Sequence, residues 1–284
     1  MKVITIVLTV IMVVSQIALV DLVIPGATNP APIVEASAER VVDVAAYHPE
    51  RVTLGNASNY SPPDFTSYSS TQEKKEAFYH YLLPLIHKAN LEVVKERLWL
   101  SAMADALLNN VSLSRLQLNE LTKFEKRYRI KTKNLSTAER VGALLLRVDV
   151  VPASLVVAQA AKESGWGTSR FAIEGNNYFG IWCFYEGCGL TPLRRDHNRA
   201  HEVATFGSVE QGVRYYVRTI NTHIAYNGLR KVRANAKRIQ QAVEGEKLAD
   251  GLIRYSERGM PYVKEIQSMI RFNKMQRFTR NYSV

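Results

Sequence analysis

Cysteine and glycine are scarce in this sequence. Two cysteines among 284 residues exclude a disulfide-dense mini-protein, and 15 glycines exclude a collagen-like chain. Charged residues make up only 22% and hydrophobic residues 46%, which excludes a wholly disordered chain. No internal repeat is visible. The remaining class is an ordinary globular protein, whose length suits about two domains and one sizeable core.

Acidic residues are also in the minority. Asp and Glu number 26 against 37 Lys and Arg, so the formal charge is +11. Residues 230–284 alone hold 13 basic and five acidic side chains. A basic body of this kind favours polyanionic partners, such as nucleic acid, an anionic membrane surface or an anionic wall polymer. No nucleic-acid-binding module is recognisable, and a solvated helix face is the simpler explanation of the C-terminal charges.

The N-terminal stretch bears on the compartment. From Val3 to Val20 the chain is almost entirely apolar, and Lys2 is the one charge before it. This pattern suits a membrane span as well as a secretory signal, and residues 36–38 (Ala-Ser-Ala) offer a distant cleavage site. A buried helix is the third alternative. We predict a signal peptide or membrane anchor over 1–25, which places the remainder in the cell envelope or periplasm and argues against nucleic acid as a partner.

The rest of the chain divides by its periodicity. Residues 56–72 are rich in Ser, Asn, Pro and Tyr and lack helical periodicity, so we predict a linker over 26–72. From residue 73 on, apolar residues recur at steps of three and four, which indicates helices. Pro84 should kink or split the first of them. The expected helices cover 73–108, 112–130, 137–147, 208–224, 234–243 and 262–272, with a loop or short hairpin over 183–206.

The run from Val151 to Gly167 is the most informative for chemistry. Pro152 suits the first helical position and Gly165 the position after a helix end, and the residues between them are apolar nearly all round. Such a helix should be buried. Glu163 then lies in its last turn, where burial and the negative end of the helix dipole should both raise the pKa of the carboxyl. A carboxylic acid still protonated near neutral pH is what a glycosidase needs, because it must give a proton to the leaving sugar oxygen.

A simpler alternative is that Glu163 is a surface residue paired with Lys162 or Arg170. The neighbourhood argues against it. Trp166 could provide an apolar wall or a stacking face for a sugar, and residues 175–182 (Gly-Asn-Asn-Tyr-Phe-Gly-Ile-Trp) follow. A buried helix, a glycine-rich break and an aromatic loop together are typical of the floor of a carbohydrate cleft.

These two segments carry a family resemblance. Residues 158–167 (Ala-Gln-Ala-Ala-Lys-Glu-Ser-Gly-Trp-Gly) and 176–181 (Asn-Asn-Tyr-Phe-Gly-Ile) resemble the glucosaminidase module of bacterial wall hydrolases, and the length and N-terminal extension look like its Bax-type members. The resemblance implies a mainly α, lysozyme-like helical domain with a small β-lobe over 136–284, preceded by a helical extension over 73–135. It also implies an endo-β-N-acetylglucosaminidase that cleaves the β-1,4 bond after N-acetylglucosamine in peptidoglycan.

The resemblance also implies roles for residues. The catalytic acid of the family falls on Glu163. The family's C-terminal pattern, a tyrosine followed by a second tyrosine that opens the last helix, falls on Tyr255 and Tyr262. Tyr262 would assist at the reacting sugar, although a core aromatic at an interface is an alternative. The sugar cleft would be lined by Trp166, Asn177, Phe179 and Tyr255. No metal and no organic cofactor is expected, and the partners would be peptidoglycan glycan strands with an anionic wall polymer or membrane surface.

A second carboxylate is less clear. The β-lobe offers Glu186, Asp196 and Glu202, none of them in an unmistakable motif. A distant second carboxylate would support inversion, and a near one would act as nucleophile. A third route uses the acetamido oxygen of the substrate as nucleophile and needs one enzymic acid. We favour the third route because the second acid cannot be named, and lytic transglycosylase chemistry is a related alternative.

The two cysteines lie in the same lobe. Cys183 and Cys188, with His197 and His201, approach a zinc-finger spacing, but the middle interval is short. In an oxidising compartment a local disulfide is favoured over zinc or free thiols. A Cys183 nucleophile with His197 as base would instead indicate an amidase or peptidase. A non-catalytic peptidoglycan-binding or scaffold protein is the alternative from another functional class.

Overall fold

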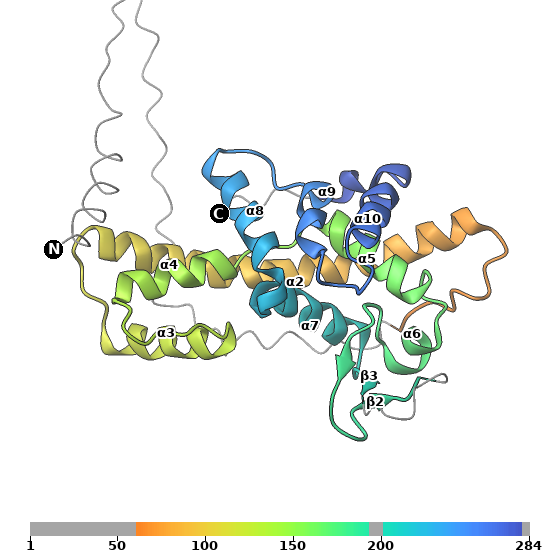
Figure 1. Ribbon diagram of the computed structural model, residues 1–284, viewed down its shortest axis with the longest axis horizontal. Coiled ribbons are helices and arrows are strands. Elements are labelled where there is room, and N and C mark those ends of the chain that lie inside the picture. Colours follow the sequence, from red (N-terminus) through yellow and green to blue (C-terminus); the bar gives the residue numbers. More distant parts are fainter. Residues whose placement is uncertain (1–60, 193–200, 280–284) are drawn as a thin grey trace, which may run out of the picture. The chain divides into compact units, whose positions relative to one another are not determined.

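The computed structural model describes residues 61–192 and 201–279 (Figure 1). The apolar stretch from Val3 to Val20, most of the expected linker, Asp196 and His197 lie outside these residues. The fold is mainly helical, with one small three-stranded antiparallel sheet and a helical N-terminal extension, which confirms the predicted class. Within the described ranges no helix is both long and apolar enough to cross a membrane. The domain boundaries stay predictions.

The helical extension is dominated by one long helix, α2 (Thr71–Leu108), capped by the Ser70 side chain. The helix continues through Pro84, so the expected split does not occur. Pro84 is exposed, which lets water satisfy the backbone carbonyl that a proline leaves unpaired. Leu82 and Leu85 on either side are buried and hold both halves of α2 on the same core.

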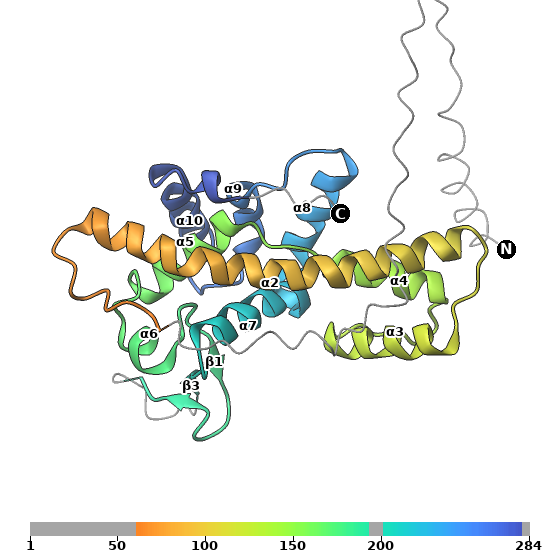
Figure 2. The same ribbon diagram turned by 180° about the vertical axis from the view of Figure 1, so that it is seen from behind.

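Two shorter helices follow α2, one in the predicted extension and one at the start of the domain predicted over 136–284. Both α3 (Arg115–Arg127) and α4 (Thr137–Arg147) begin with a capping box. The serine before each helix, Ser114 or Ser136, accepts a hydrogen bond from the backbone N–H of the third helical residue. The backbone N–H of the same serine donates to the side chain of that residue. The cap at Ser114 starts α3 later than its periodicity suggested. In Figures 1 and 2, α4 lies beside α2, and the two helices are in contact.

The predicted buried helix is α5 (Ala153–Ser164). Every residue from Ala153 to Ala161 is buried, and Gly165 ends the helix in the left-handed conformation at φ 59°. Pro152 is the N-cap residue rather than the first helical residue. The start of α5 is fixed from α2, because the buried Asn90 side chain donates to Val151 O at 2.8 Å and accepts from Val151 N at 3.1 Å.

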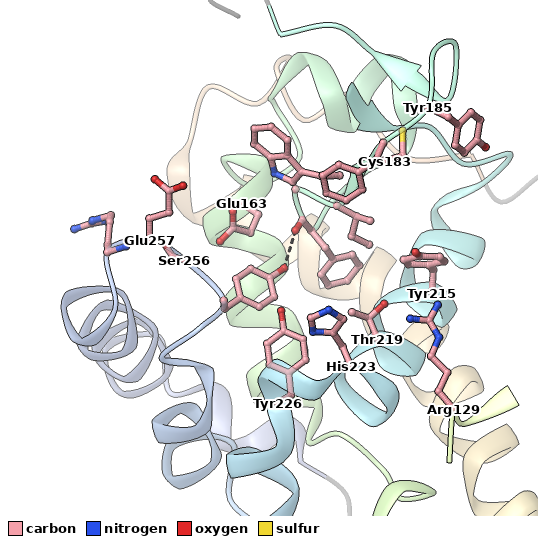
Figure 3. A pocket seen from close by; sticks show the side chains of 17 residues that line it. Arg129, Glu163, Cys183, Tyr185, Tyr215, Thr219, His223, Tyr226, Ser256 and Glu257 are labelled. Atoms are coloured by element: carbon pink, nitrogen blue, oxygen red, sulfur yellow. Dashed lines mark hydrogen bonds between the residues drawn. The ribbon is translucent and has the colours of Figure 1, made fainter. Parts of the chain in front are cut away.

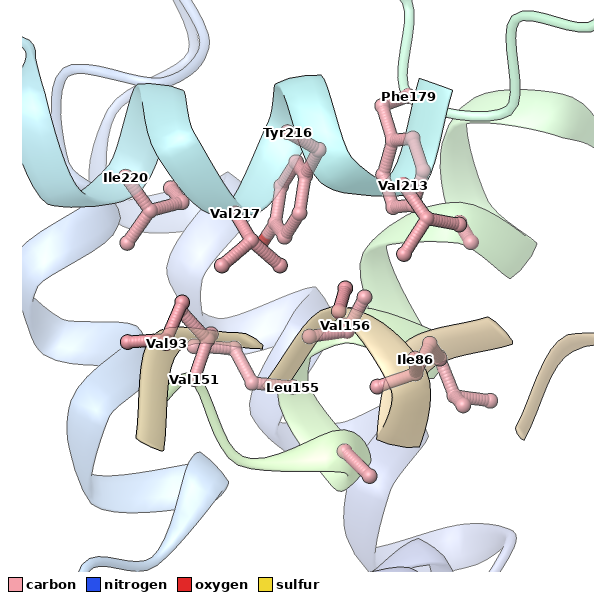
Figure 4. Packing of buried hydrophobic residues seen from close by; sticks show 14 of the residues in the cluster. Ile86, Val93, Val151, Leu155, Val156, Phe179, Val213, Tyr216, Val217 and Ile220 are labelled. Atoms are coloured by element: carbon pink, nitrogen blue, oxygen red, sulfur yellow. The ribbon is translucent and has the colours of Figure 1, made fainter. Parts of the chain in front are cut away.

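Several helices pack around α5. Both α2 and α10 (Met260–Phe272) contact it directly. Figure 4 shows side chains of α7 (Val209–Thr222) above those of α2 and α5 in a single apolar cluster. Because α2 contributes to that cluster, the extension is part of the core around α5. The remaining helical elements are α6 (Arg170–Gly175), η3 (Ile224–Tyr226), α8 (Asn227–Arg238), α9 (Gly245–Leu248), η4 (Ala249–Leu252) and η5 (Met275–Phe278).

Helix α8 corrects one expectation. We expected a helix over 234–243, but α8 begins at Asn227 and ends at Arg238. Its buried face includes Arg230 and Arg233, which periodicity places on the solvent side because arginine is usually exposed. Arg233 is enclosed because its guanidinium donates to the backbone carbonyl of Asp149 and to Asn221, and faces the Asp149 carboxylate.

The small sheet forms the β-lobe. Its strands are β1 (Trp182–Cys183), β2 (Gly189–Leu190) and β3 (Glu202–Ala204), in the order β1-β3-β2. Cys183 and Cys188 form a disulfide across the β1–β2 turn, as favoured from the sequence. Glu202 is buried, and its carboxylate accepts from Gly187 N and Gly189 N. The lobe is therefore cross-linked both covalently and by hydrogen bonds.

The last part of the expected linker packs on the body. Phe65 is only 2% exposed and meets Phe78 of α2 edge to face at 5.5 Å between ring centroids. Its ring also covers Gly167, where a Cβ would lie 2.3 Å from the ring. Any side chain at Gly167 would displace Phe65, so this glycine is required by close packing as well as by its φ of 81°.

This packing predicts the effect of truncating Phe65. Phe65→Ala should lower the free energy of unfolding by about 3–5 kcal/mol, because it leaves a cavity in the aromatic cluster. Urea denaturation followed by circular dichroism measures the change. Phe184→Ala, at a side chain that is 81% exposed, is the matched control and should change stability little. Equal stability of the two variants would show that the segment before α2 is not part of the core.

Candidate functional site

A cavity of about 980 Å³ lies between the β-lobe and the C-terminal helices. Figure 3 shows Glu163 above Tyr226 and His223, with Glu257 at one end of the cavity and Arg129 at the other. The walls come from the end of α5, the loop before β1, the β1–β2 turn, the end of α7 and the loop before α10. The cavity thus draws on segments far apart in the sequence.

Glu163 lines this cavity from the last turn of α5. Its side chain is half-buried, and the left-handed Gly165 ends the helix just after it. Gly180 adopts φ 59° beside the carboxylate, and a Cβ at this position would lie 3.2 Å from Oε2 of Glu163. A glycine at 180 therefore satisfies the backbone conformation and leaves room for the acid.

Burial raises the pKa of Glu163 above its usual value. The hydrogen bond from Tyr262 and the positive charge of Lys162 both lower it, but they do not offset the cost of burying the charge. Lys162 itself is exposed and pairs with Glu265 at 2.7 Å. The direction of the shift agrees with the expectation from the sequence.

A chain of buried hydrogen bonds orients the acid. Tyr216 OH donates to Gln159 Oε1, Gln159 Nε2 donates to Tyr262 OH at 2.9 Å, and Tyr262 OH donates to Glu163 Oε1 at 2.8 Å. Tyr262 accepts from Gln159, so its single proton is directed at Oε1. A proton carried by Glu163 therefore sits on Oε2, the oxygen beside Gly180.

Two of the four expected cleft residues line the cavity. Tyr255 OH donates to the backbone oxygen of Phe179 at 2.7 Å, and both residues contribute to the wall. The Tyr255 ring stacks on the Tyr262 ring at 5.5 Å between centroids. Tyr262 lies behind Tyr255 and is not among the lining residues. Its hydroxyl donates to Glu163, and its expected role at the reacting sugar stays a prediction.

Trp166 and Asn177 do not line the cavity, contrary to expectation. The Trp166 ring packs against Phe78 and Tyr79 of α2, on the side of α5 that faces the extension. Asn177 is buried, donates to the backbone oxygens of Ile181 and Ala204, and accepts from two backbone N–H groups of its own loop. Its role is to hold the loop that carries Phe179 and Gly180.

The three candidates for a second carboxylate in the β-lobe lie as follows. The Glu202 carboxylate accepts two backbone N–H groups of the β1–β2 turn and does not line the cavity. Glu186 is exposed and does not line the cavity either, and Asp196 lies outside the described residues. Within the described part of the chain, the carboxylates that line the cavity are Glu163 and Glu257. Glu257 lies in no recognisable motif. Only its position two residues after Tyr255 could have predicted that it lines the cavity.

Exposed aromatic rings also line the cavity: Trp182, which ends the aromatic loop expected from the sequence, and Phe184, Tyr185 and Tyr215, which sequence reasoning missed. Flat exposed rings of this kind provide stacking faces for the apolar side of a sugar. Tyr226 adds a buried phenol whose pKa burial raises to about 12, so it stays a hydrogen-bond donor at neutral pH.

The metal alternative does not fit these residues. Donor atoms of Cys183, Cys188 and Glu202 lie within 4.8 Å of one another. The two sulfurs are joined in a disulfide, however, and the Glu202 carboxylate already accepts two backbone N–H groups. A zinc site built on the two cysteines needs their thiolates, which the disulfide removes.

Comparison with known proteins gives two matches. A family profile described as "Mannosyl-glycoprotein endo-beta-N-acetylglucosaminidase" (glucosaminidase) matches residues 142–275, which include Glu163, Glu257 and Tyr262. The protein described as "Protein bax" of Escherichia coli (strain K12) is 32% identical over 226 residues, which cover 79% of each chain. No solved structure matches the chain significantly.

The hydrogen-bond chain predicts how Tyr262 affects the acid. Tyr262→Phe removes the hydroxyl that stabilises the Glu163 carboxylate, so the pKa of Glu163 should rise further. Carbon-13 NMR titration of the glutamate carboxyl measures the shift. Tyr226→Phe lines the same cavity and donates no hydrogen bond to Glu163, so it serves as the control. An unchanged or lower pKa in Tyr262→Phe would contradict the orientation described above.

Proposed function

The chain belongs to the glucosaminidase family as a Bax-type member, and on this basis we propose that it is a peptidoglycan hydrolase. The bond cleaved is the β-1,4 bond after N-acetylglucosamine. The observation that carries the proposal is Glu163: a half-buried carboxyl with a raised pKa, at an aromatic-lined cavity large enough for a glycan. A general acid needs this combination of protonation and access.

In the proposed reaction Glu163 delivers its proton from Oε2. Tyr262 occupies Oε1, which leaves Oε2 to protonate the glycosidic oxygen as the bond to the anomeric carbon breaks. The emerging carboxylate is then stabilised by the same Tyr262 hydrogen bond. Tyr216 and Gln159 are positioning residues, because they act on Tyr262 and not on the sugar.

For the nucleophile we propose the substrate itself. The acetamido oxygen attacks the anomeric carbon while the glycosidic oxygen takes the proton of Glu163 and leaves, which forms an oxazolinium ring. Water then attacks the anomeric carbon, gives a proton to the Glu163 carboxylate and opens the ring. Support comes from the β-lobe, where neither Glu186 nor Glu202 lines the cavity. The competing route is inversion with Glu257 activating water. Proton NMR of the first product decides, because substrate assistance retains the anomeric configuration and Glu257→Gln then stays active.

We also propose that the protein works in the cell envelope. The apolar stretch from Val3 to Val20 supports export, either with a cleaved signal or with a retained anchor. The Cys183–Cys188 disulfide supports an oxidising compartment. The same disulfide weakens the amidase and peptidase alternative, because Cys183 offers no free thiol as nucleophile.

The central test is Glu163→Gln. We expect the release of muropeptides from purified sacculi to fall by about 10²–10⁴-fold, with the fold and sacculus binding intact. Glu174→Gln is the control, since Glu174 is exposed, pairs with Arg170 and lies outside the cavity lining. Mass spectrometry of the products identifies the reducing-end sugar, and an anhydro sugar would instead indicate a lytic transglycosylase. Full activity of Glu163→Gln would refute a catalytic role.

The raised pKa also predicts a pH dependence of stability. A buried Glu163 carboxylate costs the folded state free energy once the pH exceeds the usual glutamate pKa, and this cost is fully present above the raised pKa. Glu163→Gln should therefore melt at a higher temperature than the unmodified protein at pH 8. The two should melt alike at pH 3, where both side chains are neutral. Calorimetry at both pH values tests this, and a difference that does not grow with pH would contradict the burial.

A further inference from the structure

A second cavity, of about 680 Å³, has a lining with a single sign of charge. It lies among the loop after α3, helix α4, the end of α7, η3 and α8. Within the described residues no carboxylate lines it. Its basic lining residues are Arg129, Lys131, Arg147, His223, Arg230 and Lys231. We call it the cationic cavity.

Two of these arginines are anchored but not neutralised. Arg147 Nη1 donates to the backbone oxygens of Tyr128 and Thr222, and Arg230 Nη1 donates to those of Ile220 and His223. Carbonyl oxygens hold a guanidinium in place without cancelling its charge. Arg230 is 3% exposed, and burial lowers its pKa only to about 10, so it stays charged at neutral pH.

The contrast with other basic residues of α8 is direct. Arg233 and Lys237 on the same helix both face Asp149, so their charges are compensated. In the cationic cavity, Arg129, Lys131 and Lys231 are exposed and have no ion-pair partner in the part of the chain that the structure describes. A net positive charge therefore remains around a hollow, which favours an anionic occupant.

The cavity also offers apolar contacts. Ile130, Leu146 and Ile224 line it, and Ile224 is 74% exposed. Such a mixture of cations and alkyl side chains suits carboxylates carried on a chain with small apolar groups, as in a short peptide. A flat lipid surface is a poorer match, because the buried Arg230 charge lies inside a hollow that a planar membrane does not enter.

The cationic cavity joins the 980 Å³ cavity at Glu163, which we call the glycan cavity. Arg129 and His223 line both. In Figure 3, Arg129 lies at the end of the glycan cavity away from Ser256 and Glu257, and His223 lies between Arg129 and Tyr226. A substituent that projects from a bound glycan at this end would therefore lie beside the basic residues of the cationic cavity.

We propose that the cationic cavity binds the carboxylates of the peptides attached to the glycan strand. This inference rests on the proposed function, because wall glycan carries short peptides with free carboxylates on the lactyl ethers of alternate sugars. The glycan cavity would then select the bond, and the cationic cavity would select strands that still carry peptides.

The test compares two pairs of charge reversals. Lys131→Glu with Lys231→Glu changes the cationic cavity without touching the lining of the glycan cavity. Lys95→Glu with Lys264→Glu makes the same change in net charge at exposed positions that line neither cavity. Each pair is placed in the Glu163→Gln background, so that the substrate is not consumed during binding.

Binding is measured to intact sacculi and to sacculi from which an amidase has removed the peptides. We expect tighter binding to intact sacculi, a loss of about ten-fold for the Lys131/Lys231 pair on intact sacculi alone, and no loss for the control pair. The preference should also weaken as salt is added. Equal binding of both pairs to intact sacculi would overturn the proposal.

Two further measurements separate the outcomes. Calorimetric titration with a soluble wall peptide measures peptide binding without catalysis. Its result remains valid even if Glu163→Gln proves active and the proposed hydrolysis is refuted. Binding to phosphatidylglycerol vesicles examines the lipid alternative. If the Lys131/Lys231 pair loses vesicle binding but keeps the preference for intact sacculi, the cavity is a lipid site and the proposal is wrong.

Discussion

The candidate site depends above all on the hydrogen bond between Tyr262 and Glu163, because two opposing effects set the pKa of this one carboxyl. Enclosure by the protein favours the neutral acid, and the phenol favours the carboxylate. Enclosure has the larger effect, so the pKa of Glu163 is raised, and the phenol remains the hydrogen-bond partner of Oε1. Tyr216 and Gln159 fix the direction of that partner from within the core.

The helical extension has a structural part in this arrangement. Helix α2 packs on α5 and α7, and Asn90 of α2 fixes the backbone just ahead of α5. The acid lies at the other end of α5. A rigid α5 therefore transmits the anchoring by α2 to the position of Glu163, and loss of the extension would expose a helix that is apolar on nearly every side.

The sequence could predict what local patterns determine. The buried run of α5, its end at Gly165 and the disulfide all follow from residue types at close spacing. Trp166 and Asn177 could not be placed, because an aromatic packs equally well on a sugar or on Phe78, and an amide satisfies backbone groups as readily as a ligand. Arg230 made the α8 prediction wrong, because its burial depends on the carbonyl of Ile220 in α7 and that of His223 just after α7. Glu257 reaches the cavity only through the tertiary fold.

The disulfide has a practical consequence for anyone who prepares the protein. Phe184 and Tyr185 lie within the short loop that the Cys183–Cys188 disulfide closes, and both aromatic side chains line the glycan cavity. The closed loop limits their freedom before any sugar arrives, which lowers the entropy lost on binding. Protein produced in a reducing cytosol lacks this constraint, so weaker binding of the proposed glycan by such material would reflect the missing disulfide.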